Sequence, residues 1–243
     1  MVKKGQPEKL IIKGKRLDGR ALDEMRKVSI KAGIIPEAEG SAEVIFGETR
    51  VVAAVYGPRE VIPRHLADPR RAYLNVNYSM ASFSTGERNR PGPSRRSKEI
   101  SKVMTEALSP AIKLEKYPKT KIDVYVEVIN ANAGTRTAAI NAASVALADA
   151  GLEMNDLVTS VAGGKIDGKL VLDLFQPEDN YGEADFPIAI LPRTGEVSLL
   201  QMDGNLKPEE IEKLLTTIKK ACNELYEKQK KALKERYKIK WKS

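Results

Sequence analysis

Four carboxylates occupy one short segment of the chain, which reads Glu178-Asp179-Asn180-Tyr181-Gly182-Glu183-Ala184-Asp185. Carboxylates at this density can hold Mg²⁺, or one of them can keep a raised pKa and give a proton to a leaving oxygen. The segment also links two apolar runs, so a polar surface turn is the alternative interpretation. Sequence reasoning leaves both interpretations open at this point.

A second candidate is the segment Ala133-Gly134-Thr135-Arg136-Thr137, which follows a predicted strand and opens a predicted helix. Free backbone amides and a hydroxyl at such a place can bind an oxyanion, and an arginine can clamp it. The segment lacks the lysine and the spacing of a nucleotide P-loop. It is either an oxyanion site or an ordinary connection between a strand and a helix.

Cations gather in a third segment, Arg90-Pro91-Gly92-Pro93-Ser94-Arg95-Arg96. Ser94 is a suitable N-cap, which places Arg95 and Arg96 in the first turn of a helix. Cations at that end oppose the helix dipole, so helix stability does not explain them. A docked RNA phosphate would explain them, which favours a binding role.

The only histidine and the only cysteine indicate less chemistry. His65 lies in Pro63-Arg64-His65 with no serine, cysteine or second histidine nearby, so neither a catalytic triad nor a zinc site is indicated. It is a surface residue or a nucleic-acid contact. Cys222 has no disulfide partner in the chain and is expected to be a buried packing residue.

Alternating apolar residues and turn signals predict the strands that would position these groups. Gly47-Glu48 separates the arms of one hairpin, and Asp167-Gly168 forms the tight turn of another. The predicted strands are 42–46, 50–56, 73–79, 122–128, 161–166, 170–175, 185–191 and 196–202.

Helical periodicity predicts an amphipathic helix over 100–112 and an alanine-rich helix that follows Thr137 and ends at Ala150. A long helix begins at Pro208, and its basic end continues to Lys242. The order of elements indicates an α+β fold with two similar halves. We expect one domain over 1–243, with halves at about 16–115 and 120–226 and a basic tail at 227–243.

The net charge of +8 is unevenly spread along the chain. Residues 88–102 and 227–243 are strongly basic, whereas residues 153–185 hold eight acids against two lysines. Such separation suits a site that grips phosphates in one place and handles protons or metal in another. No apolar run is long enough to span a membrane and the N-terminus lacks a signal peptide's apolar stretch, so the cytoplasm is the expected compartment.

In this order, these segments resemble the RNase PH family, and within it the catalytic exosome subunits of archaea. The resemblance covers nearly the whole chain, because seven short motifs are in register. They are residues 16–20, Tyr56-Gly57-Pro58, Pro63-Arg64-His65, Ser94-Arg95-Arg96, Gly134-Thr135-Arg136, residues 178–185 and Gln201-Met202-Asp203-Gly204.

The resemblance implies a pair of β-α-β halves and a ring of six such domains around a pore. It implies phosphorolysis, in which inorganic phosphate attacks the last phosphodiester of RNA and a nucleoside diphosphate leaves. By resemblance, the following roles are expected: Gly134, Thr135 and Arg136 hold the phosphate; Arg95 and Arg96 grip the RNA; Arg64 and His65 line the pore; Asp179 and Asp185 are general acids or Mg²⁺ ligands.

The implied partners are the 3′ ends of single-stranded RNA, a non-catalytic sister subunit that completes a ring of three heterodimers, and RNA-binding cap subunits. One alternative is a bacterial-type enzyme that trims transfer RNA as a homo-hexamer, which gel filtration of the chain alone would reveal. The other is a non-catalytic, RNA-binding ring subunit. The presence of Arg136, Asp179 and Asp185 together disfavours that second alternative.

Overall fold

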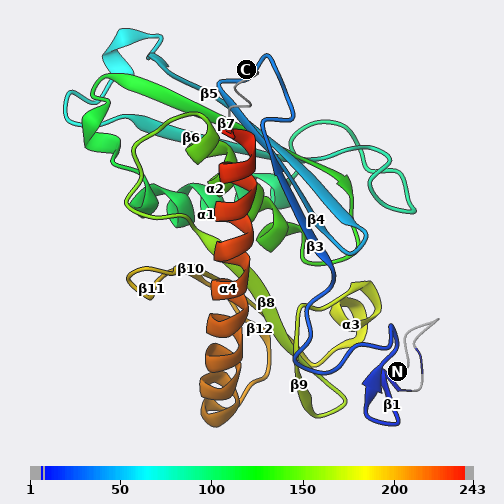
Figure 1. Cartoon of the computed structure of the whole chain (residues 1–243). Helices are drawn as coiled ribbons and strands as arrows, with labels where there is room; N and C mark the ends of the chain where they lie inside the picture. Colours follow the sequence, from blue (N-terminus) through cyan, green and yellow to red (C-terminus); the bar gives the residue numbers. More distant parts are fainter. Residues whose placement is uncertain (1–6, 8, 239–243) are drawn as a thin grey trace, which may run out of the picture.

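The first half of the chain forms a mixed sheet, because its apolar residues alternate along strand-length runs. The computed structural model describes residue 7 and residues 9–238. Neighbouring strands are antiparallel except β6 and β7, which are parallel and connected through α1 (Arg95–Leu108). Across this sheet, in the upper part of Figure 1, the strands are β3 (Val28–Ala32), β4 (Gly40–Phe46), β5 (Thr49–Glu60), β7 (Thr120–Asn130) and β6 (Tyr73–Met80).

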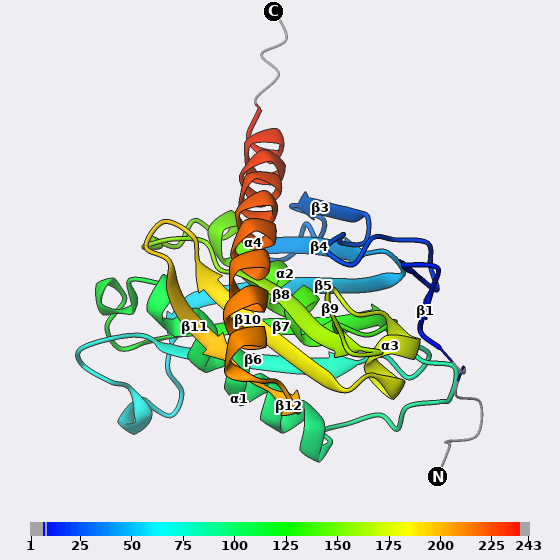
Figure 2. The same ribbon diagram turned by 90° about the horizontal axis from the view of Figure 1, so that it is seen from below.

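A second, antiparallel sheet follows in the sequence. Its strand order is β11 (Glu196–Leu200), β10 (Ala184–Leu191), β8 (Thr159–Ile166) and β9 (Lys169–Leu172). The two-residue strand β12 (Asp203–Gly204) pairs with the start of β10. The N-terminal hairpin of β1 (Ile11–Ile12) and β2 (Lys15–Arg16) lies beside β9 and the short helix α3 (Gln176–Tyr181) in both views (Figures 1 and 2).

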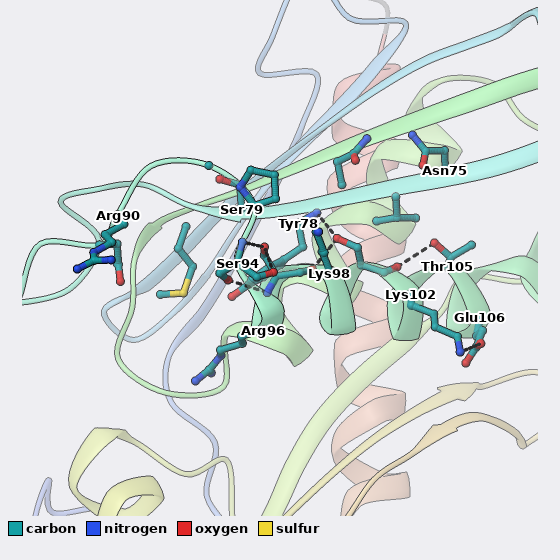
Figure 3. A pocket seen from close by; sticks show the side chains of 18 of the residues that line it. Asn75, Tyr78, Ser79, Arg90, Ser94, Arg96, Lys98, Lys102, Thr105 and Glu106 are labelled. Carbon is teal, nitrogen blue, oxygen red and sulfur yellow. Dashed lines mark hydrogen bonds and ion pairs between the residues drawn. The ribbon is translucent and has the colours of Figure 1, made fainter. Parts of the chain in front are cut away.

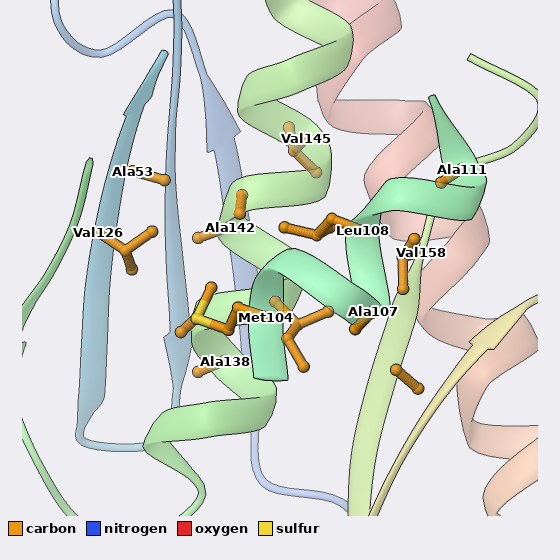
Figure 4. Close-up of a cluster of buried hydrophobic side chains, with 14 of the residues drawn as sticks. Ala53, Met104, Ala107, Leu108, Ala111, Val126, Ala138, Ala142, Val145 and Val158 are labelled. Carbon is orange, nitrogen blue, oxygen red and sulfur yellow. The ribbon is translucent and has the colours of Figure 1, made fainter. Parts of the chain in front are cut away.

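Helix α2 (Thr135–Asp149) lies between the two sheets and is buried along almost its whole length. Apolar side chains lie all around this helix, and buried polar ones such as Asn141 and Ser144 have hydrogen-bond partners, as expected of a helix that is covered on every side. Figure 4 shows how Ala138, Ala142 and Val145 of α2 pack with Met104 and Leu108 of α1. Val126 of the first sheet lies on one side of these helices and Val158, which precedes β8, on the other. One continuous core therefore joins both sheets.

The long helix α4 (Pro208–Arg236) packs on β8 and β3 and stands out from the body of the molecule in Figure 2. Its C-terminal end contacts the end of α2. Arg236 Nε lies 3.6 Å from Asp149 Oδ1, and Tyr237 Oη donates to the same carboxylate at 3.1 Å. Part of the basic tail thus holds the two helices together. The predicted continuation of the basic end to Lys242 cannot be compared, because residues 239–242 lie outside the described residues.

Most predicted elements are confirmed, and so is the α+β class. The hairpin around Gly47-Glu48, the strand at 122–128, the alanine-rich helix and the Ser94 cap all occur; Ser94 Oγ accepts from Ser97 N at 3.0 Å. The helix predicted over 100–112 begins at Arg95, and a 3₁₀ turn over Ser109–Ala111 follows it. Cys222 is buried, as predicted.

One local prediction was wrong, and one of two open interpretations is excluded. The strand predicted over 170–175 ends at Leu172, because Asp173 adopts a left-handed conformation (φ +54°) that breaks the pairing. Residues 178–185 are not a surface turn between strands. They form most of α3 and the start of β10, because Pro177 suits the first turn of a helix and Glu178 completes its N-terminal hydrogen bonds.

Among the described residues, no helix is both long and apolar enough to cross a membrane. Long helix α4 is amphipathic, with Leu214, Ile218, Cys222 and Leu225 buried on one face.

Strand β4 approaches the end of α2 so closely that only glycine fits at position 40. A Cβ there would lie 2.3 Å from the carbonyl oxygen of Ala146 and 2.2 Å from the amide nitrogen of Ala150. We predict that Gly40→Ala destabilises the protein by about 1–3 kcal/mol, as overpacking does elsewhere. Gly86→Ala is the control, because a Cβ at Gly86 meets nothing within 4 Å. Equal melting temperatures for the two variants would contradict the packing described.

Candidate active site

A pocket of about 280 Å³ opens where the end of β7 and the start of α2 meet α3 and the start of β10. It brings together residues that are far apart in the sequence and come from both sheets. Six of the nine predicted site residues line it: Arg96, Gly134, Thr135, Arg136, Asp179 and Asp185. The two sheets thus each contribute one side of the pocket.

The chain enters α2 through two consecutive left-handed residues, Ala133 (φ +56°) and Gly134 (φ +63°). Gly134 is the N-cap and supplies no capping side chain, so within the described structure the first backbone amides of α2 keep their hydrogen-bonding capacity. Thr137 Oγ1 donates back to the Gly134 carbonyl at 2.9 Å and fixes the turn. Such an arrangement at a helix N-terminus is able to accept an anion.

Thr135 is held by a residue that sequence reasoning missed. Tyr78 lies on β6, is 4% exposed, and donates from its hydroxyl to Thr135 Oγ1 at 3.0 Å. Burial raises the pKa of the Tyr78 hydroxyl, so it stays protonated and remains a donor. In the sequence, Tyr78 alternates with Leu74 and Val76 as part of an apolar strand face, and only the fold shows that its polar end reaches the loop.

Arg136 lines the same pocket and carries an unsatisfied donor. Its Nε atom is buried and has no hydrogen-bond partner within the part of the chain that the structure describes. A buried guanidinium N–H without an acceptor is costly. The pocket therefore offers a strong donor to an incoming anion.

Asp179 and Asp185, which line the same pocket, have raised pKa values. Burial raises the pKa of Asp185 to about 7, and the neighbouring charge of Asp179 adds to the rise, while Arg136 opposes it. Burial also raises the pKa of Asp179, and the charges of Arg96 and Arg136 lower it. Asp179 is exposed and Asp185 is half-buried, so burial acts more strongly on the pKa of Asp185. A carboxyl group that titrates near neutral pH can donate a proton.

A third acid, Asp203, lies directly opposite Asp185 in the pairing of β12 with β10. Its charge adds to the rise in the pKa of both Asp179 and Asp185. Gly204 permits this approach: it has φ +92°, and a Cβ there would lie 2.1 Å from the carbonyl oxygen of Glu183. Sequence reasoning placed Asp203 and Gly204 in a motif but gave them no role.

Arginines at the start of α1 lie beside the pocket. Arg96 lines it and also lines a larger groove, of about 730 Å³, between β6 and α1. Figure 3 shows Arg90 and Arg96 at one end of this groove and Lys102 and Glu106 at the other. Arg95 is exposed in the same helical turn and lines neither space.

Arg64 and His65 are not brought into the pocket. They lie in a 3₁₀ turn, η1 (Arg64–Leu66), which follows β5. The pairing of β5 with β7 runs from Glu60 opposite Thr120 to Arg50 opposite Asn130, and ten residues of strand span about 33 Å. Both residues are exposed at the far end of the first sheet, where Arg64 pairs with Glu60 at 2.7 Å.

No cluster of three or more His, Cys, Asp or Glu side chains suited to a metal ion occurs among the described residues. The four carboxylates of 178–185 have separate surroundings. Glu178 is buried in an ion pair with Arg16, and Glu183 is exposed and accepts from the amide of Gly168 at 2.5 Å. Asp179 and Asp185 alone among the four line the pocket.

Comparison with known proteins agrees with this geometry. Residues 24–153 match the model of the 3′ exoribonuclease family, domain 1, and residues 156–221 match domain 2 of the same family. The chain belongs to the 3′ exoribonuclease family. The predicted RNase PH-like fold and the predicted phosphorolytic 3′-to-5′ exoribonuclease activity are therefore confirmed.

Relatives of this exoribonuclease are similar over nearly their whole length. The protein named Exosome complex component Rrp41 from Methanopyrus kandleri is 55% identical over 233 residues, which are 96% of this chain and 98% of the relative. The protein of the same name from Pyrococcus furiosus is 54% identical over 224 residues, which are 92% of this chain and 90% of the relative.

Solved structures share the fold. A chain of the Archaeoglobus fulgidus exosome with RNA bound to the active site has a TM-score of 0.77 and 27% identity, covering 88% of this chain and 92% of that one. Rice Rrp46 has a TM-score of 0.82 at 22% identity, covering 90% of this chain and all of that one, and it supports the fold alone.

The raised pKa of Asp185 predicts that this exoribonuclease loses stability as pH rises. Its pKa is 3.8 in the unfolded chain and about 7 in the folded one, so the folded state binds more protons between these values. At pH 8, Asp185→Asn should be more stable than wild type by on the order of 1–4 kcal/mol, and the difference should vanish near pH 4.

Thermal unfolding across pH 4 to 8 measures this difference. Glu212→Gln, on the exposed face of α4, serves as the control and should follow wild type at every pH. A pH-independent effect of Asp185→Asn would contradict the burial of a titrating acid.

Proposed function

We propose that the chain removes nucleotides one at a time from the 3′ end of single-stranded RNA, with inorganic phosphate as the attacking group at the pocket around Arg136. The unsatisfied Nε of Arg136, a residue that lines the same pocket as two acids, is the observation that carries this proposal. An anion satisfies that donor, and the α2 N-terminus reinforces the attraction.

Gly134, Thr135 and Arg136 would hold the attacking phosphate. The backbone amides of the first turn of α2 lie at the pocket. The Thr135 hydroxyl accepts a hydrogen bond from Tyr78 and can donate its own proton to a ligand. The attacking phosphate and the RNA diester are both negatively charged, so each needs a cationic side chain beside it. Arg136 and Arg96, which both line the pocket, would supply this charge.

Asp185 would act as the general acid, with Asp179 as the second acid of the site. The phosphate oxygen forms a bond to the last backbone phosphorus, and the bond from that phosphorus to the 3′ oxygen of the preceding nucleotide breaks. The leaving 3′ oxygen takes the proton of Asp185, whose pKa of about 7 keeps a protonated fraction at neutral pH. The products are a nucleoside diphosphate and RNA shortened by one nucleotide. Because one phosphate linkage replaces another, excess diphosphate reverses the reaction and adds 3′ tails.

A magnesium ion fits the same two acids. Mg²⁺ is commonly bound by one or two carboxylates together with water and substrate phosphates, and Asp179 and Asp185 offer such a pair. When bound, the ion would neutralise charge on the reacting phosphates. A bound cation would offset the repulsion between the two carboxylates that raises the pKa of Asp185, and Asp185 would then act as a ligand in place of a proton donor.

Arg95 and Arg96 would grip the RNA backbone near its 3′ end, and Arg64 and His65 would contact RNA farther along its path. The cationic start of α1 lacks acids in its first turn, which suits a phosphate ligand. The exposed position of Arg64 and His65, about 33 Å away along the sheet, suits a pore that RNA threads before reaching the pocket.

The names of the relatives support a place in an exosome complex. We infer a hexameric ring of three heterodimers, in which a non-catalytic sister subunit of the same fold alternates with this chain, with RNA-binding cap subunits on the ring. Within the ring, the chain acts as one domain with two halves. The cytoplasm is the proposed compartment.

Phosphate dependence is the first test. The assembled protein with a 5′-labelled single-stranded RNA should shorten it only when inorganic phosphate is present, and should release nucleoside diphosphates. Arg136→Lys should raise the KM for phosphate and lower kcat about tenfold or more, because a lysine cannot reproduce the guanidinium geometry. Release of monophosphates at the same rate without phosphate would show hydrolysis and reject the proposal.

The second test concerns RNA binding. Replacing both Arg95 and Arg96 by Ala should weaken binding of every RNA sequence and reduce the slope of log affinity against log salt by roughly 1.4, at about 0.7 per phosphate contact. Stability should not fall, since the change removes cations from a helix N-terminus. Lys219→Ala with Lys220→Ala, an exposed pair on α4, is the matched control. An unchanged slope with a lower melting temperature would assign the arginines to structure.

A further inference from the structure

A buried ion pair joins the loop before α2 to the segment before α3. Arg26 donates to both carboxylate oxygens of Asp173, from Nη2 at 2.6 Å and from Nε at 2.9 Å. Its backbone amide donates to the same carboxylate at 2.8 Å. Through Nη1 the same guanidinium donates to the carbonyl of Asn132 at 2.5 Å. One buried cation therefore contacts the loop of the first sheet and the turn of the second.

Two further residues strengthen this connection. The Asn132 side chain accepts from the backbone amide of Gln176, the first residue of α3, at 2.8 Å. Thr49, which is fully buried, donates from Oγ1 to the Ala133 carbonyl at 2.8 Å and accepts from the Asn132 amide at 3.0 Å. The two residues before Gly134 are thus fixed on one side to β5 and on the other to α3.

Backbone strain occurs at both ends of the connection. Ala133 (φ +56°) and Asp173 (φ +54°) adopt a left-handed conformation that is unfavourable for residues with a Cβ. Such conformations persist only where the surrounding contacts impose them, and they concentrate at functional sites. Arg26 also packs directly against the loop, since a Cβ built on Gly134 would lie 2.9 Å from its Nη2.

We propose that Arg26, Thr49, Asn132 and Asp173 form a clamp that positions the phosphate-binding loop relative to the catalytic acids. The inference rests on the proposed function, because it assigns phosphate to the Gly134 loop and proton donation to the acids of α3 and β10. In-line attack requires the nucleophile and the acid on opposite sides of one phosphorus, within tenths of an ångström. The loop and α3 belong to different sheets, and the clamp fixes the distance between them. These four are positioning residues and do not line the pocket.

Two variants loosen the clamp while changing little else. Thr49→Val keeps the shape of the side chain and removes the hydroxyl that serves both Asn132 and Ala133. Arg26→Lys keeps a cation, but a single ammonium cannot bridge both oxygens of Asp173 and the Asn132 carbonyl. Ser144→Ala is the matched control. It also removes a fully buried hydroxyl that accepts a backbone amide, that of Val158 at 2.8 Å, and it lies outside the pocket.

The assembled protein carrying each variant is measured in three ways: steady-state phosphorolysis, RNA binding without phosphate, and amide hydrogen exchange. In Thr49→Val and Arg26→Lys, kcat should fall about tenfold or more and the KM for phosphate should rise, since small misplacements are costly for oriented reactants. The Kd for RNA should stay within about twofold, because the arginines of α1 are untouched. Amides of 132–135 and 176–179 should exchange faster together.

In thermal unfolding, Ser144→Ala should lower the melting temperature about as much as Thr49→Val does. It should leave kcat, the KM for phosphate and the exchange rates of both segments unchanged. The clamp is overturned if kcat falls no more in the two variants than in Ser144→Ala, or if the two segments keep wild-type exchange rates. A wild-type protein that releases no diphosphates would instead refute the proposed function. The exchange measurement would still decide whether the clamp couples the loop to α3.

Discussion

Helix α2 must be covered on every side, because it lies between two sheets and almost every residue along it is buried. Small residues such as Ala138 and Ala142 let the first sheet approach it, and Gly40 lets β4 approach its end. A helix held in this way has a fixed N-terminus. The anion site at Gly134 is therefore set by the core of the molecule, and α3 and β10 bring the acids to it from the second sheet.

The charges of the pocket follow from this arrangement. Arg136 and Arg96 come from the helices between the sheets, whereas Asp179 and Asp185 come from the second sheet and its connection. Placing two acids together in a half-buried pocket costs stability, which is the usual consequence of keeping a functional group away from its preferred ionisation state. In the proposed mechanism, the same arrangement provides one group that gives a proton and others that attract phosphate, which is what phosphorolysis of RNA requires.

The sequence predicted those features that depend on a few neighbouring residues. The β4–β5 hairpin, the α2 loop and the Ser94 cap each follow from a few adjacent residues. Helix α3 was missed because it spans only six residues and has no periodicity to detect. Arg26 and Asp173 were missed because they are 147 residues apart and meet only in the folded chain. Asp173 did carry a signal: an acid inside the apolar run 171–175 needs a buried partner. No pattern in the sequence identifies that partner.

Tracing the attacking phosphate into the product tests most directly whether inorganic phosphate is the nucleophile. Phosphorolysis with ³²P-labelled inorganic phosphate and unlabelled single-stranded RNA should place the label in the β-phosphate of the released nucleoside diphosphate, with one label for each nucleotide removed. The Arg136→Lys variant should transfer label more slowly at the same phosphate concentration. Shortening of the RNA with no label in the released nucleotides would mean that water attacks. The pocket at Arg136 would then not be the site that binds the nucleophile.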